Sequence, residues 1–206
     1  MAELRLPLDE ATVRGLAVGD YVELSGRMIT GRDAAHKWLV ADRREEVAPY
    51  LEGTVIYHCG PVVRRGEDGS WTFVAAGPTT SIREEPYQAD VICRYGVRGV
   101  IGKGGMGPRT LEGLRRCGAV YLHAVGGAAQ VLARSVRRVE RVFMLEEFGV
   151  PEALWVIEVE RFPAVVTMDA HGRSLHETVE EASRRRLEEL LGRGETEPRP
   201  RPGGES

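Results

Sequence analysis

Residues 97–123 read VRGVIGKGGMGPRTLEGLRRCGAVYLH, and the fold class follows from this stretch. The apolar run Val97–Ile101 predicts a short strand, which leads directly into a glycine-rich loop. Arg109–Cys117 then predicts a helix, and Ala119–His123 predicts the next strand. A strand, a glycine loop, a helix and a second strand in this order are typical of an α/β domain, whose binding sites lie at the carboxyl ends of the strands.

The same alternation extends in both directions along the chain. The further strands predicted are Tyr21–Ser25, Thr54–His58, Trp71–Ala76, Leu154–Val159 and Ala164–Met168, and the further helices are Arg32–Asp42, Glu84–Tyr95, Ala128–Arg134 and Ser174–Leu191. We therefore expect one domain over residues 1–191. Residues 192–206 are rich in Pro, Gly, Arg and Glu and have nothing to bury, so they predict a disordered tail.

Composition excludes several classes of protein. The chain has 206 residues, 42% of them hydrophobic, and a net charge of −3, which gives no electrostatic footprint for nucleic acid. No run of about 18 apolar residues could span a bilayer, so we expect no membrane partner. The N-terminal residues lack the basic-then-apolar layout of a signal peptide, so we expect the protein in the cytoplasm.

The cysteines give no sign of a metal site. Cys59, Cys93 and Cys117 are odd in number, include no C-x-x-C pair and have no histidine at zinc spacing. We expect all three to be reduced and to behave as small apolar residues, and we assign no metal ligand in this chain.

Three loops between predicted strands and helices each carry one basic residue. The loops are residues 30–36, 77–83 and 101–107, and their basic residues are Arg32, Arg83 and Lys103. In the first loop, Thr30 with Asp33 three residues on resembles a capping box. A helix N-terminus presents unpaired N–H groups and a partial positive charge, which attract carboxylate or phosphate, and a neighbouring Arg or Lys strengthens the attraction. The three loops together predict a site for a small polyanion.

Six short strings follow one another along the chain: T-G-R-D-A-A-H, Y-x-x-G-P, G-P-T-T-S-x-R, I-G-K-G-G-M, V-G-G-A-A and E-x-x-W-x-I-E-V-E-x-F-P-A. Together they resemble the β subunit, or C-terminal domain, of class I iron–sulfur fumarate hydratases and L-tartrate dehydratases. The resemblance covers about residues 6–191. It departs at Glu84-Glu85, where the family commonly has Met-Asp, and this extra negative charge leaves the substrate open.

The resemblance implies a three-layer swivelling β/β/α domain within the α/β class. It also implies a hydro-lyase that hydrates fumarate reversibly to malate with a [4Fe-4S] cluster, which the partner α subunit holds and this chain does not. The expected partners are that α subunit and a dicarboxylate substrate, in a homodimer or an α2β2 heterotetramer. Two alternatives stay open: an L-tartrate dehydratase β subunit, and a stand-alone dicarboxylate-binding module without catalysis.

The resemblance also assigns roles to residues of the three loops. Arg32 and Arg83 match carboxylate-binding positions, as bidentate recognition of a dianion requires, and Lys103 matches a substrate-binding lysine. Thr79 is the candidate base, although a threonine hydroxyl is a poor base unless a partner lowers its pKa. The remaining candidates are Asp33 and His36 for catalysis, and Gly77, Thr80 and Gly104 for substrate binding.

Each of these remaining candidates has a structural alternative. Asp33 and His36 lie three residues apart on one helix face and either lower the pKa of Thr79 or support Arg32, while Asp33 alone could cap its helix. Gly77 could be a turn former only, and Gly104 could serve only to permit a close backbone approach.

Overall fold

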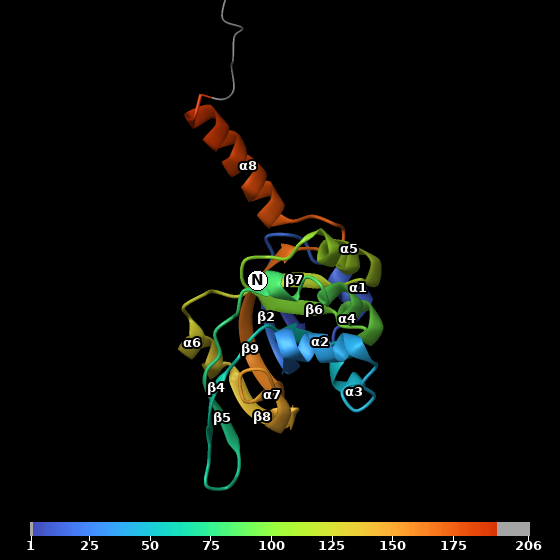
Figure 1. Ribbon diagram of the computed structural model, residues 1–206, viewed down its shortest axis with the longest axis vertical. Coiled ribbons are helices and arrows are strands. Elements are labelled where there is room, and N and C mark those ends of the chain that lie inside the picture. The colour runs from blue at the N-terminus through green and yellow to red at the C-terminus, as the bar shows by residue number, and fades with distance from the viewer. Residues whose placement is uncertain (1, 193–206) are drawn as a thin grey trace, which may run out of the picture.

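A seven-stranded sheet organises the computed structural model, which describes residues 2–192 and is a mixed α/β fold (Figure 1). The strands, in their order across the sheet, are β1 (Ala2–Arg5), β2 (Tyr21–Thr30), β3 (Val55–Tyr57), β6 (Gly99–Gly102), β7 (Val120–His123), β9 (Leu154–Met168) and β8 (Val136–Phe143). A separate two-stranded sheet contains β4 (Val62–Arg65) and β5 (Trp71–Ala75). The helices are α1 (Glu10–Arg14), α2 (Asp33–Ala41), α3 (Ala48–Leu51), the 3₁₀ helix η1 (Ser81–Glu84), α4 (Gln88–Tyr95), α5 (Pro108–Cys117), α6 (Ala129–Arg134), α7 (Leu145–Phe148) and α8 (Leu175–Leu190).

Parallel pairing places several strand ends at one edge of the sheet. β1, β2, β3, β6 and β7 pair in parallel, whereas β9 runs antiparallel to β7, β8 and β2. Because β9 also pairs with β2, the strands β2, β3, β6, β7 and β9 form a closed ring of pairings. The carboxyl ends of β2, β3 and β6 therefore lie side by side, which is where an α/β fold places a ligand.

Two apolar cores lie on opposite faces of these strands. Successive residues of a strand point to opposite faces, so Met28 belongs to one core and Ile29 to the other, as do Tyr57 and Ile56. The second core also receives side chains of α2, α4 and α5, which cover that face of the sheet in Figure 1. The first core receives side chains of α1, α6 and β5. Both faces of the central strands are thus buried.

The strand and helix predictions are largely confirmed, with two corrections. Leu154–Val159 and Ala164–Met168 are parts of one 15-residue strand, β9, because β2 pairs with both halves. The helix expected from Glu84 begins only at Gln88, and Ser81–Glu84 forms η1 instead. Pro86 stands between them, and proline lacks the N–H that a continuous helix would need. β8 was not predicted, and its residues are half-buried or exposed without a regular alternation.

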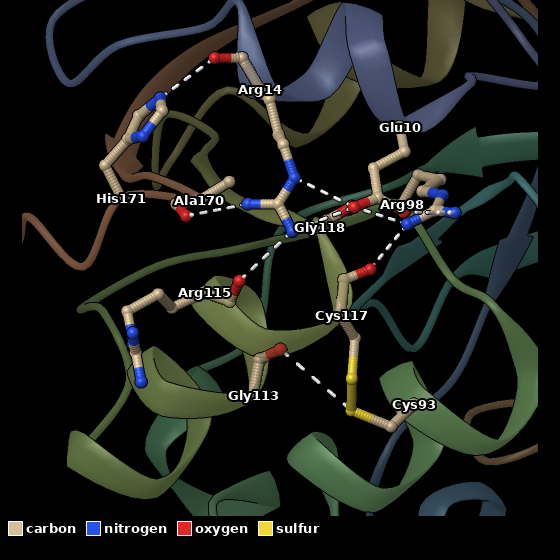
Figure 2. A network of polar contacts seen from close by, with 10 residues as sticks. All are labelled: Glu10, Arg14, Cys93, Arg98, Gly113, Arg115, Cys117, Gly118, Ala170 and His171. Atoms are coloured by element: carbon tan, nitrogen blue, oxygen red, sulfur yellow. Dashed lines mark hydrogen bonds and ion pairs between the residues drawn. A yellow bond between two sulfur atoms is a disulfide. The ribbon is translucent and has the colours of Figure 1, made fainter.

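The expectation of three reduced cysteines is wrong for two of them. Cys93 of α4 and Cys117 of α5 form a disulfide, with their Cα atoms 5.5 Å apart (Figure 2). The two helices pack side by side on the same face of the sheet. The spacing of the two cysteines in the sequence does not indicate that they lie close together in space. Cys59 is free and buried, and burial raises the pKa of its thiol to about 12.

Figure 2 shows how the same region joins the N-terminal helix to the end of α5. Arg98 donates hydrogen bonds to the carbonyl oxygens of Cys117 and Gly118, where the helix leaves carbonyl groups without helical partners. Glu10 of α1 forms ion pairs with Arg98, at 3.3 Å, and with Arg14, at 2.8 Å. This network lies outside the three predicted loops.

The last helix extends away from the rest of the molecule in Figure 1. Its N-cap is Ser174, the first residue of the predicted helix, whose side chain accepts a hydrogen bond from the Glu177 N–H at 3.3 Å. Val179, Leu187 and Leu190 remain exposed on it. The expected tail, apart from Gly192, lies outside the described residues. Among residues 2–192, no helix has both the length and the apolar character to cross a bilayer.

Candidate functional site

The three predicted loops meet around one cavity of about 320 Å³. Its lining consists of Arg32, Gly60, Gly77, Pro78, Thr79, Thr80, Arg83 and Lys103. Six of the nine candidate residues are therefore brought together. Among the residues that the structure describes, Asp33, His36 and Gly104 do not belong to this lining.

Backbone hydrogen bonds hold the loops against the strand ends. The Gly31 N–H donates to the Tyr57 carbonyl at 3.0 Å, which joins the first loop to the end of β3. The Thr79 N–H donates to the His58 carbonyl at 2.7 Å, and the Lys103 N–H donates to the Thr79 carbonyl at 3.3 Å. The backbone thus fixes the relative positions of the first, second and third loops.

Arg32 reaches the cavity from the N-terminus of α2. Its Nη2 lies 3.2 Å from Glu152 Oε1, and its side chain is 21% exposed. A Cβ atom at Gly60 would lie only 2.6 Å from Arg32 Nη1, so the absence of a side chain at Gly60 makes room for the guanidinium group.

Arg83 and Thr79 are in direct contact. Arg83 Nη2 donates a hydrogen bond to Thr79 Oγ1 at 3.1 Å and lies 3.2 Å from Asp33 Oδ2. A guanidinium group beside the hydroxyl stabilises the alkoxide form more than the neutral form, and Asp33 fixes the orientation of that guanidinium. Asp33 therefore contacts the cavity through Arg83.

Carboxylates of the chain itself occupy the helix N-termini at the site. Glu152 Oε2 accepts from the Ala34 N–H of α2 at 3.1 Å. At the start of α5, Glu85 accepts from the N–H groups of Gly107 and Arg109, at 2.8 Å and 2.9 Å. This differs from the expectation that free helix N-termini attract the anion. These donors are already satisfied, so the positive charge of the cavity comes from side chains.

The capping box expected at Thr30 and Asp33 is also absent from α2. The N-cap residue of α2 is Arg32, and no side chain caps it locally. The Thr30 hydroxyl instead accepts from the Trp155 N–H at 3.1 Å, because Thr30 is the last residue of β2 and lies beside β9. The carboxylate of Asp33 is consequently available to Arg83.

His36 lies in a buried polar layer beneath the cavity. It is fully buried, and its Nδ1 lies 2.9 Å from the Arg32 carbonyl oxygen. Its ring packs edge-to-face on His58, whose two nitrogens contact Ser81 Oγ at 2.9 Å and Gln88 Oε1 at 2.7 Å. Burial lowers the pKa of both imidazoles, so they are neutral at ordinary pH. His36 thus supports the backbone of Arg32.

Of the remaining candidates, Thr80 and Gly77 line the cavity, and Gly104 follows Lys103 in the chain. Thr80 pairs with Lys103 in an isolated β-bridge, and Gly104 has a left-handed φ of 83° with no other atom within 4 Å of the place that a Cβ would take. Gly77 lies against Ala129 of α6, where an added Cβ would meet the Ala129 Cβ at 3.2 Å. These positions fit both a binding role and the structural alternatives.

Besides Gly60 and Pro78 of the lining, two acidic residues near the cavity were not among the predicted ones. Glu152 comes from the segment before β9, and no local signal linked it to α2. Glu84 is fully buried in η1, and neither of its carboxylate oxygens has a hydrogen-bond partner in the described chain. For Glu84 there was a signal, because glutamate replaces the methionine that the resembled family commonly has there.

The cysteines of this chain do not fit an iron–sulfur cluster. Such a cluster is held by cysteine thiolates, but Cys93 and Cys117 are joined to each other and Cys59 is buried with a raised thiol pKa. Within residues 2–192, no group of three or more His, Cys, Asp or Glu side chains could hold a metal ion.

Comparison with known proteins places the chain in a family. The family model described as "Fumarase C-terminus" matches residues 2–179. The chain is 52% identical over 188 residues to the "Putative fumarate hydratase class I" of Geobacillus stearothermophilus, covering 91% of this chain but only 36% of that protein. It is 42% identical over 188 residues to the "Putative L(+)-tartrate dehydratase subunit beta" of Methanocaldococcus jannaschii, covering 90% of this chain and 96% of the relative. It is 40% identical over 174 residues to the L(+)-tartrate dehydratase subunit beta of Escherichia coli K12, covering 84% and 85%. The chain spans about a third of the Geobacillus protein and most of the other two, and it belongs to the fumarase C-terminal family.

Proposed function

We propose that this chain is the β subunit of a two-subunit, [4Fe-4S]-dependent hydro-lyase that hydrates fumarate reversibly to malate. The observation that carries the proposal is the convergence of Arg32, Arg83 and Lys103 with Thr79 on one cavity. Among the described residues, no carboxylate lines that cavity. The relatives' names support a hydro-lyase, and they favour L-tartrate as the alternative substrate.

The basic residues bind the substrate as a dianion. Two arginines can each pair with one carboxylate, and the lysine adds a point charge. Both arginines already have internal carboxylate partners, because Glu152 contacts Arg32 and Asp33 contacts Arg83. We therefore expect the isolated chain to bind a dicarboxylate weakly, and the assembled enzyme to bind it more tightly once water is excluded.

Thr79 transfers the proton. In the dehydration direction the Thr79 alkoxide removes a proton from the carbon beside a carboxylate, and in the hydration direction the Thr79 hydroxyl returns it. The hydrogen bond from Arg83 Nη2 supports this role because it favours the alkoxide. In this proposal a cluster held by cysteines of the partner α subunit would supply a Lewis acid for the substrate hydroxyl, and this chain's residues bind the carboxylates and move the proton.

The assembly also belongs to the proposal. The chain acts as a three-layer swivelling domain that covers the substrate on the α subunit, and the complex is an α2β2 heterotetramer. The half-exposed side chain of Arg83 supports this arrangement, since a partner surface would complete its burial. The cytoplasmic location stays a prediction.

An anaerobic dehydratase assay tests the proposal. The full chain is assayed alone and after co-expression with a cluster-bearing α subunit, with malate, L-tartrate and citramalate as substrates. Activity only in the pair is the expected result, and the preferred acid identifies the substrate. Absence of activity in both, together with tight dicarboxylate binding by the chain alone in calorimetry, would favour the stand-alone binding module.

The Thr79 role is tested by substitution in the assembled enzyme. Thr79→Ala removes the base, so we expect turnover to fall by on the order of 10²–10⁴-fold while the complex still assembles. Thr79→Ser keeps the hydroxyl and should retain much of the activity. Thr72→Ala, at an exposed position of β5, is the matched control. Unchanged turnover of Thr79→Ala would remove Thr79 from the mechanism.

A further inference from the structure

Glu84 is a buried carboxyl group that the proposed mechanism does not use. It is the last residue of η1 and has 0% exposed surface. Neither Oε1 nor Oε2 receives a hydrogen bond from any described residue. A buried carboxylate without a donor is costly, whereas a protonated carboxyl group needs only an acceptor.

The acceptor is available on α2. Asp33 begins α2, which packs against η1, and its Oδ2 lies 3.2 Å from Nη2 of Arg83, the residue before Glu84; a hydrogen bond between the two carboxyl groups requires a proton on one of them. Glu84 is fully buried whereas the Asp33 side chain is 43% exposed, so Glu84 is the group that burial favours in the protonated form beside the Asp33 charge. Burial first, and then the Asp33 charge, raise the pKa of Glu84 to about 8.

The charged groups around Glu84 come from three segments. Arg83 of η1 lowers the pKa of Glu84, while Asp33 of α2 and Glu152 of the segment before β9 raise it. Deeper in the site, His36 and His58 are buried with lowered pKa values and stay neutral above pH 6.5. In the range around pH 8, Glu84 is therefore the group that changes charge beside Asp33.

We propose that Asp33 and Glu84 form a proton-sharing carboxyl pair behind the two substrate-binding arginines, and that loss of the shared proton weakens binding of the dicarboxylate. The inference rests on the proposed function. Asp33 links the pair to the cavity, since it lies 3.2 Å from Arg83 Nη2 and 3.9 Å from Arg32 Nη2. Glu84 is thus a positioning residue that acts through Asp33 and the arginines.

The sign of the effect follows from charge. While the pair holds its proton it carries one negative charge, which offsets only part of the positive charge of Arg32 and Arg83. Ionisation of Glu84 adds a second negative charge, which cancels part of the positive field and repels a dianion. Conversely, a bound dianion favours the protonated pair, so binding takes up protons near the midpoint of the titration.

The first experiment follows Glu84 in the full chain without a partner. Carbon-13 labelling of the glutamate carboxyl groups, with Glu84→Gln to assign the resonance, gives its titration curve by NMR. A midpoint above about pH 6 supports the shared proton, and a midpoint below that, toward the ordinary value for glutamate, overturns it. This readout does not depend on any enzymatic activity.

The second experiment measures KM for malate against pH in the assembled enzyme. We expect KM of the natural protein to rise on the order of tenfold between pH 7 and pH 9, with a smaller change in kcat. Glu84→Gln, which keeps an N–H donor toward Asp33 at every pH, should hold KM low across this range. Glu67→Gln, at an exposed turn residue, is the control for net charge and should follow the natural profile.

The two proposals fail in different ways. An assembled enzyme that turns over, but whose KM has the same pH profile with and without Glu84→Gln, contradicts the carboxyl pair and leaves the hydro-lyase in place. An assembled complex without activity contradicts the hydro-lyase, and the NMR titration then decides the carboxyl pair alone.

Discussion

At the residue scale, the site depends on side chains whose positions are fixed by close contacts with neighbouring residues. Arg32 illustrates this most directly, because its guanidinium lies over Gly60 and is oriented by Glu152. Its Nε is buried without a hydrogen-bond partner among the described residues, so contacts at its tip determine where the side chain lies. A small change beneath the guanidinium should therefore alter binding more than stability.

Gly60→Ala tests this dependence. The added Cβ would lie 2.6 Å from Arg32 Nη1 and 2.9 Å from the Pro151 carbonyl oxygen, so Arg32 must move. We expect KM for the dicarboxylate to rise by about tenfold or more, because misplaced binding groups lose orientation. Gly69→Ala, in a hairpin turn with no heavy atom near the added Cβ, is the control and should leave KM unchanged. A normal KM for Gly60→Ala would show that Arg32 does not bind the substrate.

At the element scale, α4 and α5 form a unit that supports two of the three loops. α4 follows the second loop and α5 follows the third, and the Cys93–Cys117 disulfide joins the two helices. At the other end of α5, the Glu85 carboxylate accepts from the Thr110 hydroxyl at 2.6 Å as well as from backbone N–H groups. Glu85, which precedes α4, thus connects the second loop to the start of α5 after the third loop.

Removal of the disulfide should lower stability and spare the site. The bridge closes a loop with a sequence separation of 24 residues, for which chain entropy predicts a contribution of about 3 kcal/mol. We expect Cys93→Ser to lower the free energy of unfolding by up to that amount in denaturant titration. Reductant should shift the natural protein to the same midpoint and leave the variant unchanged. Equal stability of the natural protein with and without reductant would contradict a bridge in solution.

At the scale of the whole molecule, Glu84 links stability to pH. Its pKa is raised to about 8 in the folded chain, whereas an unfolded chain has the ordinary value near 4.5. Between these values the folded chain binds more protons than the unfolded chain, so the free energy of unfolding falls as pH rises through this window. Below pH 4.5 this penalty is absent.

Comparison of the full chain with Glu84→Gln isolates this contribution. We expect the variant to gain stability relative to the natural protein as pH rises from 5 to 8, by on the order of 3 kcal/mol. Chemical denaturation at several pH values measures the difference, with Glu67→Gln as the control. Parallel stability profiles for the natural protein and Glu84→Gln would contradict a raised pKa.

The sequence by itself determined the local elements and the family. Apolar periodicity and glycine positions predict β2, α2, β6, α5 and β7 because strands and helices have different side-chain periods and end at identifiable residues. The motif strings identified the fumarase family, which the comparison confirmed. They also selected Arg32, Thr79, Arg83 and Lys103, which the fold brings to one cavity.

Only the tertiary structure decided the contacts between distant segments. Glu152 at the N-terminus of α2, Glu85 at the N-terminus of α5 and the Cys93–Cys117 bridge all join residues whose proximity depends on how helices pack over the sheet. The burial of Glu84 in η1 has the same origin. Local sequence sets backbone conformation through short-range sterics and hydrogen bonds, whereas burial and charge pairing arise only when separate elements exclude water from between them.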